Sequence, residues 1–450
     1  MTANNLSKQS VGLGDLNNQM MIEAYTGFHN KFKSMDKKTS DWVRHNFQGT
    51  TIVAERDGLS LEFPVDDLRD GDTLVRIEKF PANLEKLVHV NDKLIKELEN
   101  RGFNQFDVRV IKKQTGSAEE NRKIAVQETN EFVQKVKESV QVRESATNAV
   151  ENLMDNGRRG KANTDEIMEF VDSIVKQSSA DAISAIASLK ESDQTYAHCV
   201  DVGAIFQVVY LKTIKNMGLK SVFKDEREML LSSFLHDFGK AKVPKEILDS
   251  TVRFERDSKE MQLMQAHPVY GAEMLKKMDM PDYIVDMAHY HHVKLDTSMA
   301  SSYPSGVAFE DIRMEARLIA IIDIYQALVG KRSYKKSWAP PAAMKFIDQL
   351  SGVEYDLDIW TEFLKIMGRY PKGSAVELSD GSQAFVVSIP EADLTRPQVV
   401  QVRNAAGEDL EHHTLIDLEV ERDMSISKEL DSYESFGENV IELFASLQVI

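Results

Sequence analysis

The sequence predicts a mainly α protein: a helical bundle with a small α/β module before it and a small antiparallel β unit after it. Apolar residues recur at helical spacing through most of the region from 113 to 368, and short alternating apolar runs lie on both sides of it. Because 450 residues suffice for several domains with sizeable cores, we expect five regions. They are a region without a predicted role (1–58), the α/β module (59–112), a helical linker (113–180), the main helical domain (181–368) and the β unit with a closing helix (369–450).

The α/β module is predicted from two strand patterns and one helix. The run LEFPVDDLRDGDTLVRI, just after Leu59, places Asp70-Gly71 between apolar segments, so we expect a strand, a turn and a strand. The segment VNDKLIKELENRGF predicts a short helix that ends at Gly102, and FDVRVI after it predicts another strand.

A long helix is predicted over 117–155, which lacks Gly and Pro and has interleaved charges. Four valines follow one another at near-heptad spacing: Val126, Val133, Val136 and Val140. Either the helix packs on its neighbours, or it forms a two-stranded signalling coiled coil. The segment NGRRGKANT predicts its end.

The C-terminal region changes from helical to alternating periodicity. SAVELSDGSQAFVVSI places Asp380-Gly381 between two strands, and VVQVRNAAGEDL repeats the pattern. We therefore expect a small antiparallel β unit, followed by a closing helix within 433–450.

Composition excludes several classes of function. A net charge of −17 argues against a groove for nucleic-acid polymers, which needs clustered Lys and Arg, although a small phosphorylated ligand remains compatible. The start of the chain lacks a signal-peptide pattern, and no apolar run approaches the roughly 18–20 residues of a membrane span, so we expect no membrane insertion. The single cysteine, Cys199, excludes an internal disulfide and suits the cytoplasm.

Histidines and aspartates at intervals of roughly 25 to 40 residues are the main chemical feature of the chain. Imidazole and carboxylate hold Fe, Mn, Zn or Ni ions, and seven such groups can enclose two metals with room for solvent. A two-metal centre with an open position indicates hydrolysis of a phosphate ester. The seven candidates are His198, His236, Asp237, His267, His291, His292 and Asp323.

The His236-Asp237 pair stands at the end of an apolar run, in LLSSFLHDFGKAKVP, where Gly239 is expected to allow a turn before Lys240. A lysine there could reach a phosphate oxygen or protonate a leaving alkoxide; the alternative is a solvated surface lysine. We expect His412-His413 to form a solvated turn, and His289 to lie in the core or behind the ligands.

The ordered motifs resemble those of HD-GYP domains, metal-dependent phosphohydrolases of the HD superfamily. They are His198, HDFGK (236–240), HP (267–268), HH (291–292), Asp296, Tyr303-Pro304 and DIYQALVGKRSYK (323–335). The resemblance covers about 190–340, and VDDLRDGDTLVRI and YPKGSAVELSDGSQAFVVSI resemble the small N-terminal module and the C-terminal β extension of many bacterial members.

The resemblance implies a role for each matching residue. His198, His236, Asp237 and Asp323 match the ligands of one metal. Asp237 also bridges to a second metal, matched by His267, His291 and His292. Lys240 matches a lysine that contacts the scissile phosphate; Arg332 and Lys335 match basic residues that meet substrate phosphates, and Tyr303 belongs to the substrate-binding loop. Gln194 stands where some members have a glutamate for a third metal, so we expect two divalent ions. Fe or Mn is the first expectation for their identity, and Ni or Zn is the alternative.

The chain departs from the family pattern in one loop. Where the family reads HHE and D-G-x-G-Y-P, this chain reads HHVKLDTSMASSYP, with Val293 in place of the glutamate and three extra residues between Asp296 and Tyr303. No implied ligand is lost. The change bears on the loop that shapes the nucleotide pocket and therefore on the preferred substrate.

The implied function is hydrolysis of a cyclic dinucleotide, first of all cyclic di-GMP, to a linear dinucleotide or GMP in bacterial second-messenger signalling. The alternatives are another HD phosphohydrolase acting on a nucleotide or phosphate ester, and a binding or scaffold protein with a degenerate site. Homodimerisation and signalling protein partners are left open.

Overall fold

The computed structural model describes residues 21–25, 37–46, 51–56, 59–79, 107–111, 118–161, 163–177, 180–189, 195–250, 252, 254–330, 337–390 and 393–450. The chain divides into two compact units, Met1–Lys123 and Ile124–Ile450.

In the first unit, β2 (Thr51–Arg56), β3 (Leu59–Pro64) and β4 (Thr73–Lys79) form an antiparallel sheet in the order β3-β2-β4. The expected strands on either side of Asp70-Gly71 are present, but β2 lies between them, so they do not pair with each other.

The rest of this unit contains α1 (Lys37–Asn46), the one-turn helix η1 (Val65–Asp67), and an antiparallel pair of β1 (Met21–Tyr25) with β5 (Asp107–Ile111). The FDVRVI strand is thus observed as β5. The expected helix that ends at Gly102 lies outside the described residues.

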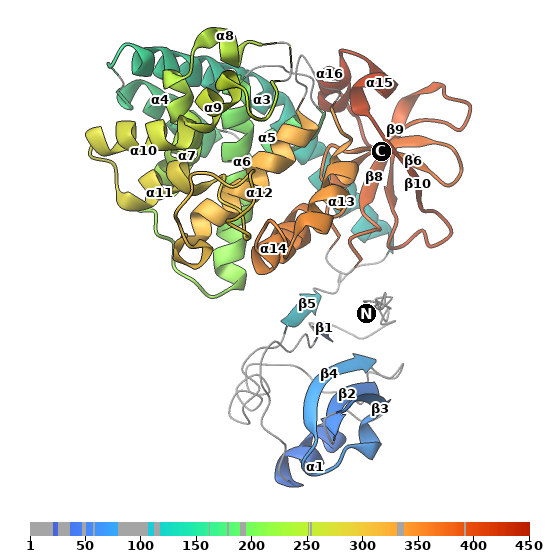
Figure 1. Ribbon diagram of the computed structural model, residues 1–450. Coiled ribbons are helices and arrows are strands. Elements are labelled where there is room, and N and C mark those ends of the chain that lie inside the picture. Colours follow the sequence, from blue (N-terminus) through green and yellow to red (C-terminus); the bar gives the residue numbers. More distant parts are fainter. Residues whose placement is uncertain are drawn as a thin grey trace. The chain divides into compact units, whose positions relative to one another are not determined.

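The second unit is mainly helical, with a five-stranded antiparallel sheet on one side (Figure 1). Its helices are α3 (Ala118–Arg158, which begins in the first unit), α4 (Asp165–Gln177), α5 (Ala180–Leu189), α6 (Thr195–Asn216), α7 (Glu226–Phe234), η3 (Leu235–Lys242), α8 (Lys245–Leu248), α9 (Lys259–Gln265), α10 (His267–Lys277), α11 (Asp282–Tyr290), η4 (Phe309–Asp311), α12 (Met314–Val329), α13 (Pro340–Leu350) and α14 (Leu357–Met367).

Helix α6 lies at the centre of the helical core. Phe206 and Tyr210 pack in one cluster with residues of α12, α13 and α14, and Val200 and Ala204 pack in another with α3, α4 and α7. By length and composition alone the segment Tyr196–Asn216 could cross a membrane, contrary to the expectation that no apolar run approaches the length of a membrane span. Most of it is buried inside the domain, and this burial accounts for its apolar composition.

The expected long helix is α3, and its valines pack within the chain. Val133 and Val136 are buried in one cluster with Ala182 and Ala185 of α5 and with residues of the C-terminal sheet. The first interpretation, packing on neighbours, is confirmed for these positions.

The C-terminal sheet has the order β10-β6-β7-β8-β9. Its strands are β6 (Ala375–Leu378), β7 (Gln383–Ser388), β8 (Gln398–Arg403), β9 (Asp409–Asp417) and β10 (Ile426–Leu430). The Asp380-Gly381 turn joins β6 to β7, as expected. In place of one closing helix there are two short ones, α15 (Ser432–Phe436) and α16 (Val440–Ala445).

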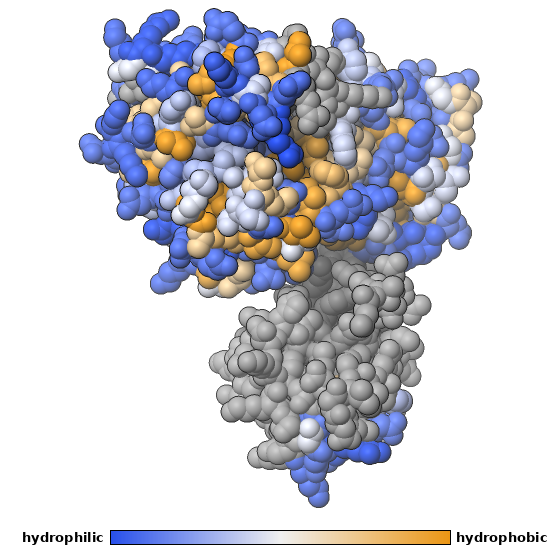
Figure 2. All heavy atoms as spheres, viewed as in Figure 1, coloured by the Kyte–Doolittle hydropathy of each residue, from blue (hydrophilic) through white to orange (hydrophobic). Residues whose placement is uncertain are grey.

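The expectation of a solvated turn at His412-His413 is wrong, because both residues lie in β9. His412 is exposed, whereas His413 is buried and its Nδ1 accepts a hydrogen bond from the backbone N–H of Gln448 at 3.1 Å. Alternation along a strand explains the contrast. In the view of Figure 2, hydrophilic residues cover most of the visible surface of the second unit, with smaller hydrophobic groups between them.

Candidate metal centre

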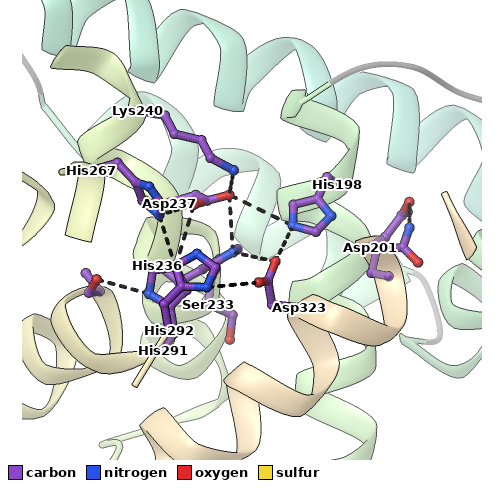
Figure 3. Close-up of polar contacts among 12 residues, drawn as sticks. His198, Asp201, Ser233, His236, Asp237, Lys240, His267, His291, His292 and Asp323 are labelled. Carbon is purple, nitrogen blue, oxygen red and sulfur yellow. Dashed lines mark hydrogen bonds and ion pairs between the residues drawn. The ribbon is translucent and has the colours of Figure 1, made fainter. Parts of the chain in front are cut away.

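Five structural elements bring the seven candidate residues together (Figure 3). Helix α6 carries His198, η3 carries His236 and Asp237, and α12 carries Asp323. His267 begins α10, and the histidine pair directly follows α11. The residues form two groups, each with ligand atoms within 4.8 Å of one another. The first group is His198, His236, Asp237 and Asp323, and the second is His267, His291 and His292.

The buried carboxylate of Asp237 lies between the two groups. Its Oδ1 is 3.2 Å from His267 Nε2 and 3.8 Å from His291 Nε2. Its Oδ2 is 3.5 Å from His236 Nε2 and 3.9 Å from His198 Nε2. One oxygen therefore faces each group, which is the arrangement a bridging carboxylate requires.

The inward nitrogens of three rings are lone-pair acceptors. The Nδ1 atoms of His236, His267 and His291 lie 2.6, 2.7 and 3.0 Å from the backbone carbonyls of Ser233, Met264 and Ala288. Because a carbonyl only accepts, each Nδ1 must carry a proton, and each ring in its neutral form then has its lone pair on Nε2. Such backbone bonds orient metal-binding imidazoles.

The donor set fits a pair of cations. Within the described residues, His236 Nε2 and Asp237 Oδ1 are buried and have no hydrogen-bond partner, which is costly unless a ligand binds them. His267 Nε2 and His291 Nε2 are 3.2 Å apart. Two nitrogens about 2.1 Å from one ion lie roughly 3.0–3.4 Å apart, so this spacing suits a shared cation. The expectation of a metal site is thus supported; the kind of metal is not indicated.

The protonation states also suit metal binding. Burial lowers the pKa of His291 to about 3, with His236 and His267 acting in the same direction. Burial likewise lowers the pKa values of His236 and His292. The rings are therefore neutral near pH 7.

The two aspartates are ionised despite their burial. Burial alone would raise the pKa of Asp237, but the ammonium of Lys240 holds it well below its usual range. Burial opposes ionisation of Asp323 too, yet the hydrogen bond with His198 holds its pKa well below its usual range. His198 Nε2 is 2.9 Å from Asp323 Oδ1.

The short helix η3 explains the contact of Lys240 with Asp237. Side chains three residues apart eclipse each other in a 3-10 helix, so Lys240 lies over Asp237, and its Nζ contacts Oδ2 of that carboxylate. The side chain of Lys240 is only 15% exposed. The alternative of a solvated surface lysine is therefore wrong.

Gly239 is required for a close backbone contact and not for the turn that the sequence predicts. A Cβ at this position would lie 1.8 Å from the carbonyl oxygen of His267 and 2.4 Å from the backbone nitrogen of Gly271. Gly239 does not have a positive φ, so the glycine serves the close approach of η3 to α10 rather than a turn. This approach brings Asp237 to His267.

The altered loop closes over one edge of the site. The rings of Tyr303 and His292 lie 4.6 Å apart, and the N–H of Tyr303 donates to the carbonyl of His292 at 3.3 Å. Val293 is buried against Phe309 and Ile312. An apolar residue thus fills the position where the family pattern has glutamate, and Tyr303 still reaches the second group.

Arg332, Lys335 and Gln194 lie outside the described residues. His289 belongs to neither group; it is half-buried and its ring lies 4.4 Å from that of Tyr290.

Sequence reasoning missed a buried network behind the first group. Arg143 of α3 pairs with Asp201 of α6, which also accepts a hydrogen bond from Gln326 of α12. A signal was present in the spacing. Asp201 and Gln326 each follow a candidate ligand by three residues, so on a helix they lie on nearly the same face one turn later.

Comparison with known proteins agrees with the site. The family described as "HD domain" matches residues 186–359, and "KOW domain associated with HD domain" matches 375–437. The chain is an HD-domain protein related to the HD-GYP cyclic di-GMP phosphodiesterases.

Two relatives and one solved structure give the extent of the similarity. The chain is 31% identical to "Cyclic di-GMP phosphodiesterase PA4108" of Pseudomonas aeruginosa over 256 residues. This matched region is 56% of this chain and 59% of that relative. It is 32% identical over 181 residues to "3'3'-cGAMP-specific phosphodiesterase 2" of Vibrio cholerae, covering 38% and 34%. The chain therefore spans three fifths or less of these relatives. The structure of Bd1817, an HDG"Y"P protein from Bdellovibrio bacteriovorus, matches with 14% identity and a TM-score of 0.37, covering 77% of this chain and 98% of that one.

Proposed function

We propose that the chain is a metal-dependent phosphodiesterase that hydrolyses a cyclic dinucleotide, first of all cyclic di-GMP, in bacterial second-messenger signalling. The position of Asp237, with one oxygen toward each group of imidazoles, is the observation that carries the proposal. A pair of cations held there suits phosphodiester hydrolysis. The two relatives, described as phosphodiesterases of cyclic di-GMP and of 3'3'-cGAMP, support this class of reaction.

The chain's own groups provide binding, charge and orientation. One divalent ion would be held by His198, His236, Asp237 and Asp323, and a second by Asp237, His267, His291 and His292. Fe or Mn is the first candidate for these ions, and Ni or Zn the alternative. When bound, the two ions would supply hydroxide near neutral pH and would stabilise charge on the phosphate.

Lys240 is the proposed cation for the reacting phosphate. Its ammonium lies beside Asp237 and its side chain is largely withdrawn from water, which strengthens its interaction with a phosphate oxygen. It would stabilise the charge that develops on the non-bridging oxygens as the ribose 3′-oxygen leaves. Arg332 and Lys335 are the proposed contacts to the other substrate phosphates, and Tyr303, against His292, would orient the nucleotide.

The altered loop makes a mixed GMP–AMP cyclic dinucleotide the second candidate substrate. The segment from Val293 to Tyr303 departs from the family pattern, and one relative is described as specific for 3'3'-cGAMP. Another phosphate ester, or a scaffold role, remains an alternative outcome. A cytoplasmic location also remains a prediction, resting on the single cysteine.

Product analysis tests the proposal. Purified chain is loaded anaerobically with Fe²⁺ or Mn²⁺ and given cyclic di-GMP or the mixed GMP–AMP cyclic dinucleotide, beside Asp237→Ala. Cleavage by the wild type alone is the expected result, and the product identifies a linear dinucleotide or mononucleotide. No cleavage of either with two ions bound would favour another phosphate ester. No cleavage and no bound metal would favour a scaffold.

A further inference from the structure

Behind the first group lies a buried bidentate ion pair. Arg143 Nε donates to Asp201 Oδ1 at 2.6 Å, and Arg143 Nη2 donates to Oδ2 at 3.0 Å. The side chain of Asp201 is fully buried and that of Arg143 is 12% exposed. A planar guanidinium that meets both oxygens of a carboxylate fixes its orientation as well as its charge.

The same carboxylate joins the two helices that carry His198 and Asp323. Gln326 Nε2 donates to Asp201 Oδ2 at 2.7 Å. Helices α6 and α12 are therefore linked twice, by His198 with Asp323 at 2.9 Å and, one turn further along each helix, by Asp201 with Gln326. Figure 3 shows Asp201 beyond His198 and Asp323, on the side away from Asp237.

We propose that Arg143 is a positioning residue for the first metal group: it holds Asp201 in the orientation that sets the distance between His198 and Asp323. The inference rests on the proposed metal centre but not on the substrate. Without the guanidinium, Asp201 would be a buried carboxylate with its principal cation removed, in a region that already contains Asp237 and Asp323. Such a group draws in water or a new partner, and its bond to Gln326 would be lost.

The network predicts a selective effect. It joins α3, α6 and α12, whereas the second group is carried by α10 and the residues that follow α11. Loss of Arg143 should therefore weaken the first metal site much more than the second. Loss of a residue that orients a metal ligand without itself touching the metal typically lowers metal affinity 10- to 100-fold.

The test is metal content, which does not depend on any substrate. Arg143→Met and Arg143→Lys are compared with Lys372→Met. Lys372 pairs with Asp181 and lies over the ring of Phe132, which belongs to α3 as Arg143 does, and none of these residues belongs to either ligand group. Each protein is equilibrated with graded Mn²⁺ well below its melting temperature, and bound metal is measured by mass spectrometry. Arg143→Met should bind one ion normally and the other 10- to 100-fold more weakly. Arg143→Lys should recover part of the loss, and Lys372→Met should bind two ions normally.

A second variant keeps the test decisive if Arg143→Met does not fold. Gln326→Met leaves the ion pair intact and removes only the link between α6 and α12, so it should show the same selective loss. The proposal is overturned if folded Arg143→Met binds both ions with wild-type affinity, or if it loses both equally. When Arg143→Met does not fold, wild-type binding of both ions by Gln326→Met overturns it. If the wild type binds two ions but cleaves no cyclic dinucleotide, the proposed substrate fails and the role of Arg143 is still tested.

Discussion

The Nε2 atoms of His267 and His291 lie 3.2 Å apart, although both rings direct their Nδ1 atoms at backbone carbonyls. Two lone pairs therefore face each other in a buried site. No hydrogen bond between these atoms can relieve that repulsion while the carbonyl bonds persist, because each ring carries one proton when neutral. A bound cation relieves it and holds both rings in place.

Removal of metal should therefore destabilise the fold. Dialysis against a chelator should lower the melting temperature, and Mn²⁺ or Fe²⁺ at a hundred times its dissociation constant should restore about 2.7 kcal/mol of stability. Differential scanning fluorimetry measures the change, with Mg²⁺ as the control ion because oxygen-rich sites suit it better. An unchanged melting temperature after verified metal removal would contradict the prediction.

Variants of the ligands should separate the two ions. His198→Ala should lose one ion and His267→Ala the other, whereas Asp237→Ala should lose both because its two oxygens face different groups. Metal analysis of the purified variants gives the stoichiometry. His412→Ala, an exposed histidine in β9, is the control and should keep both ions. Two ions retained by Asp237→Ala would rule out a bridging role.

Lys240→Met should lower kcat by roughly 100- to 1,000-fold while both ions stay bound, since the side chain is proposed to stabilise charge on the phosphate. Steady-state kinetics and metal analysis test this together. Lys242→Met removes an exposed lysine two residues away and is the matched control. Equal rates for the two variants would remove Lys240 from the proposed machinery.

Gly239→Ala should damage both folding and metal binding. Its Cβ would meet backbone atoms of α10 at 1.8 and 2.4 Å, so η3 and α10 must separate, at a cost of about 3 kcal/mol or more. In Gly157→Ala the nearest atoms belong to the outer edge of the Phe238 ring, at 2.9 and 3.0 Å, which can shift more cheaply. Urea unfolding compares the two. Similar losses would mean that the approach of η3 to α10 is not tight.

The metal-free protein should lose stability in mild acid. Burial lowers the pKa of His291 from 6.5 to about 3, so the folded state keeps this ring neutral while the unfolded chain takes up a proton below about 6.5. This group therefore leaves the free energy of unfolding unchanged above pH 6.5 and lowers it progressively as the pH falls toward 3. Melting temperatures of the chelated protein between pH 7.5 and 4.5 should decline, and less steeply for His291→Gln. Parallel curves for the two proteins would contradict this origin.

Local patterns anticipated much of the fold. The absence of Gly and Pro predicted α3, and alternation around Asp380-Gly381 predicted β6 and β7. Alternation did not show that β2 would lie between β3 and β4, because pairing order depends on contacts distant in sequence. The exposed and buried pair His412 and His413 was mistaken for a turn for a related reason: the contact that covers His413 comes from Gln448.

The sequence by itself determined the donor atoms: seven imidazoles and carboxylates in an order that resembles HD-GYP domains, with Lys240 one short turn after Asp237. Their chemistry follows from residue type, so no coordinates were needed to infer a metal centre. Only the tertiary structure decided which oxygen of Asp237 faces which group, why Gly239 must be glycine, and that Arg143 reaches Asp201 from a helix some sixty residues earlier in the chain. These relationships depend on how separate helices pack against each other, and the spacing of residues within one helix does not specify its partners.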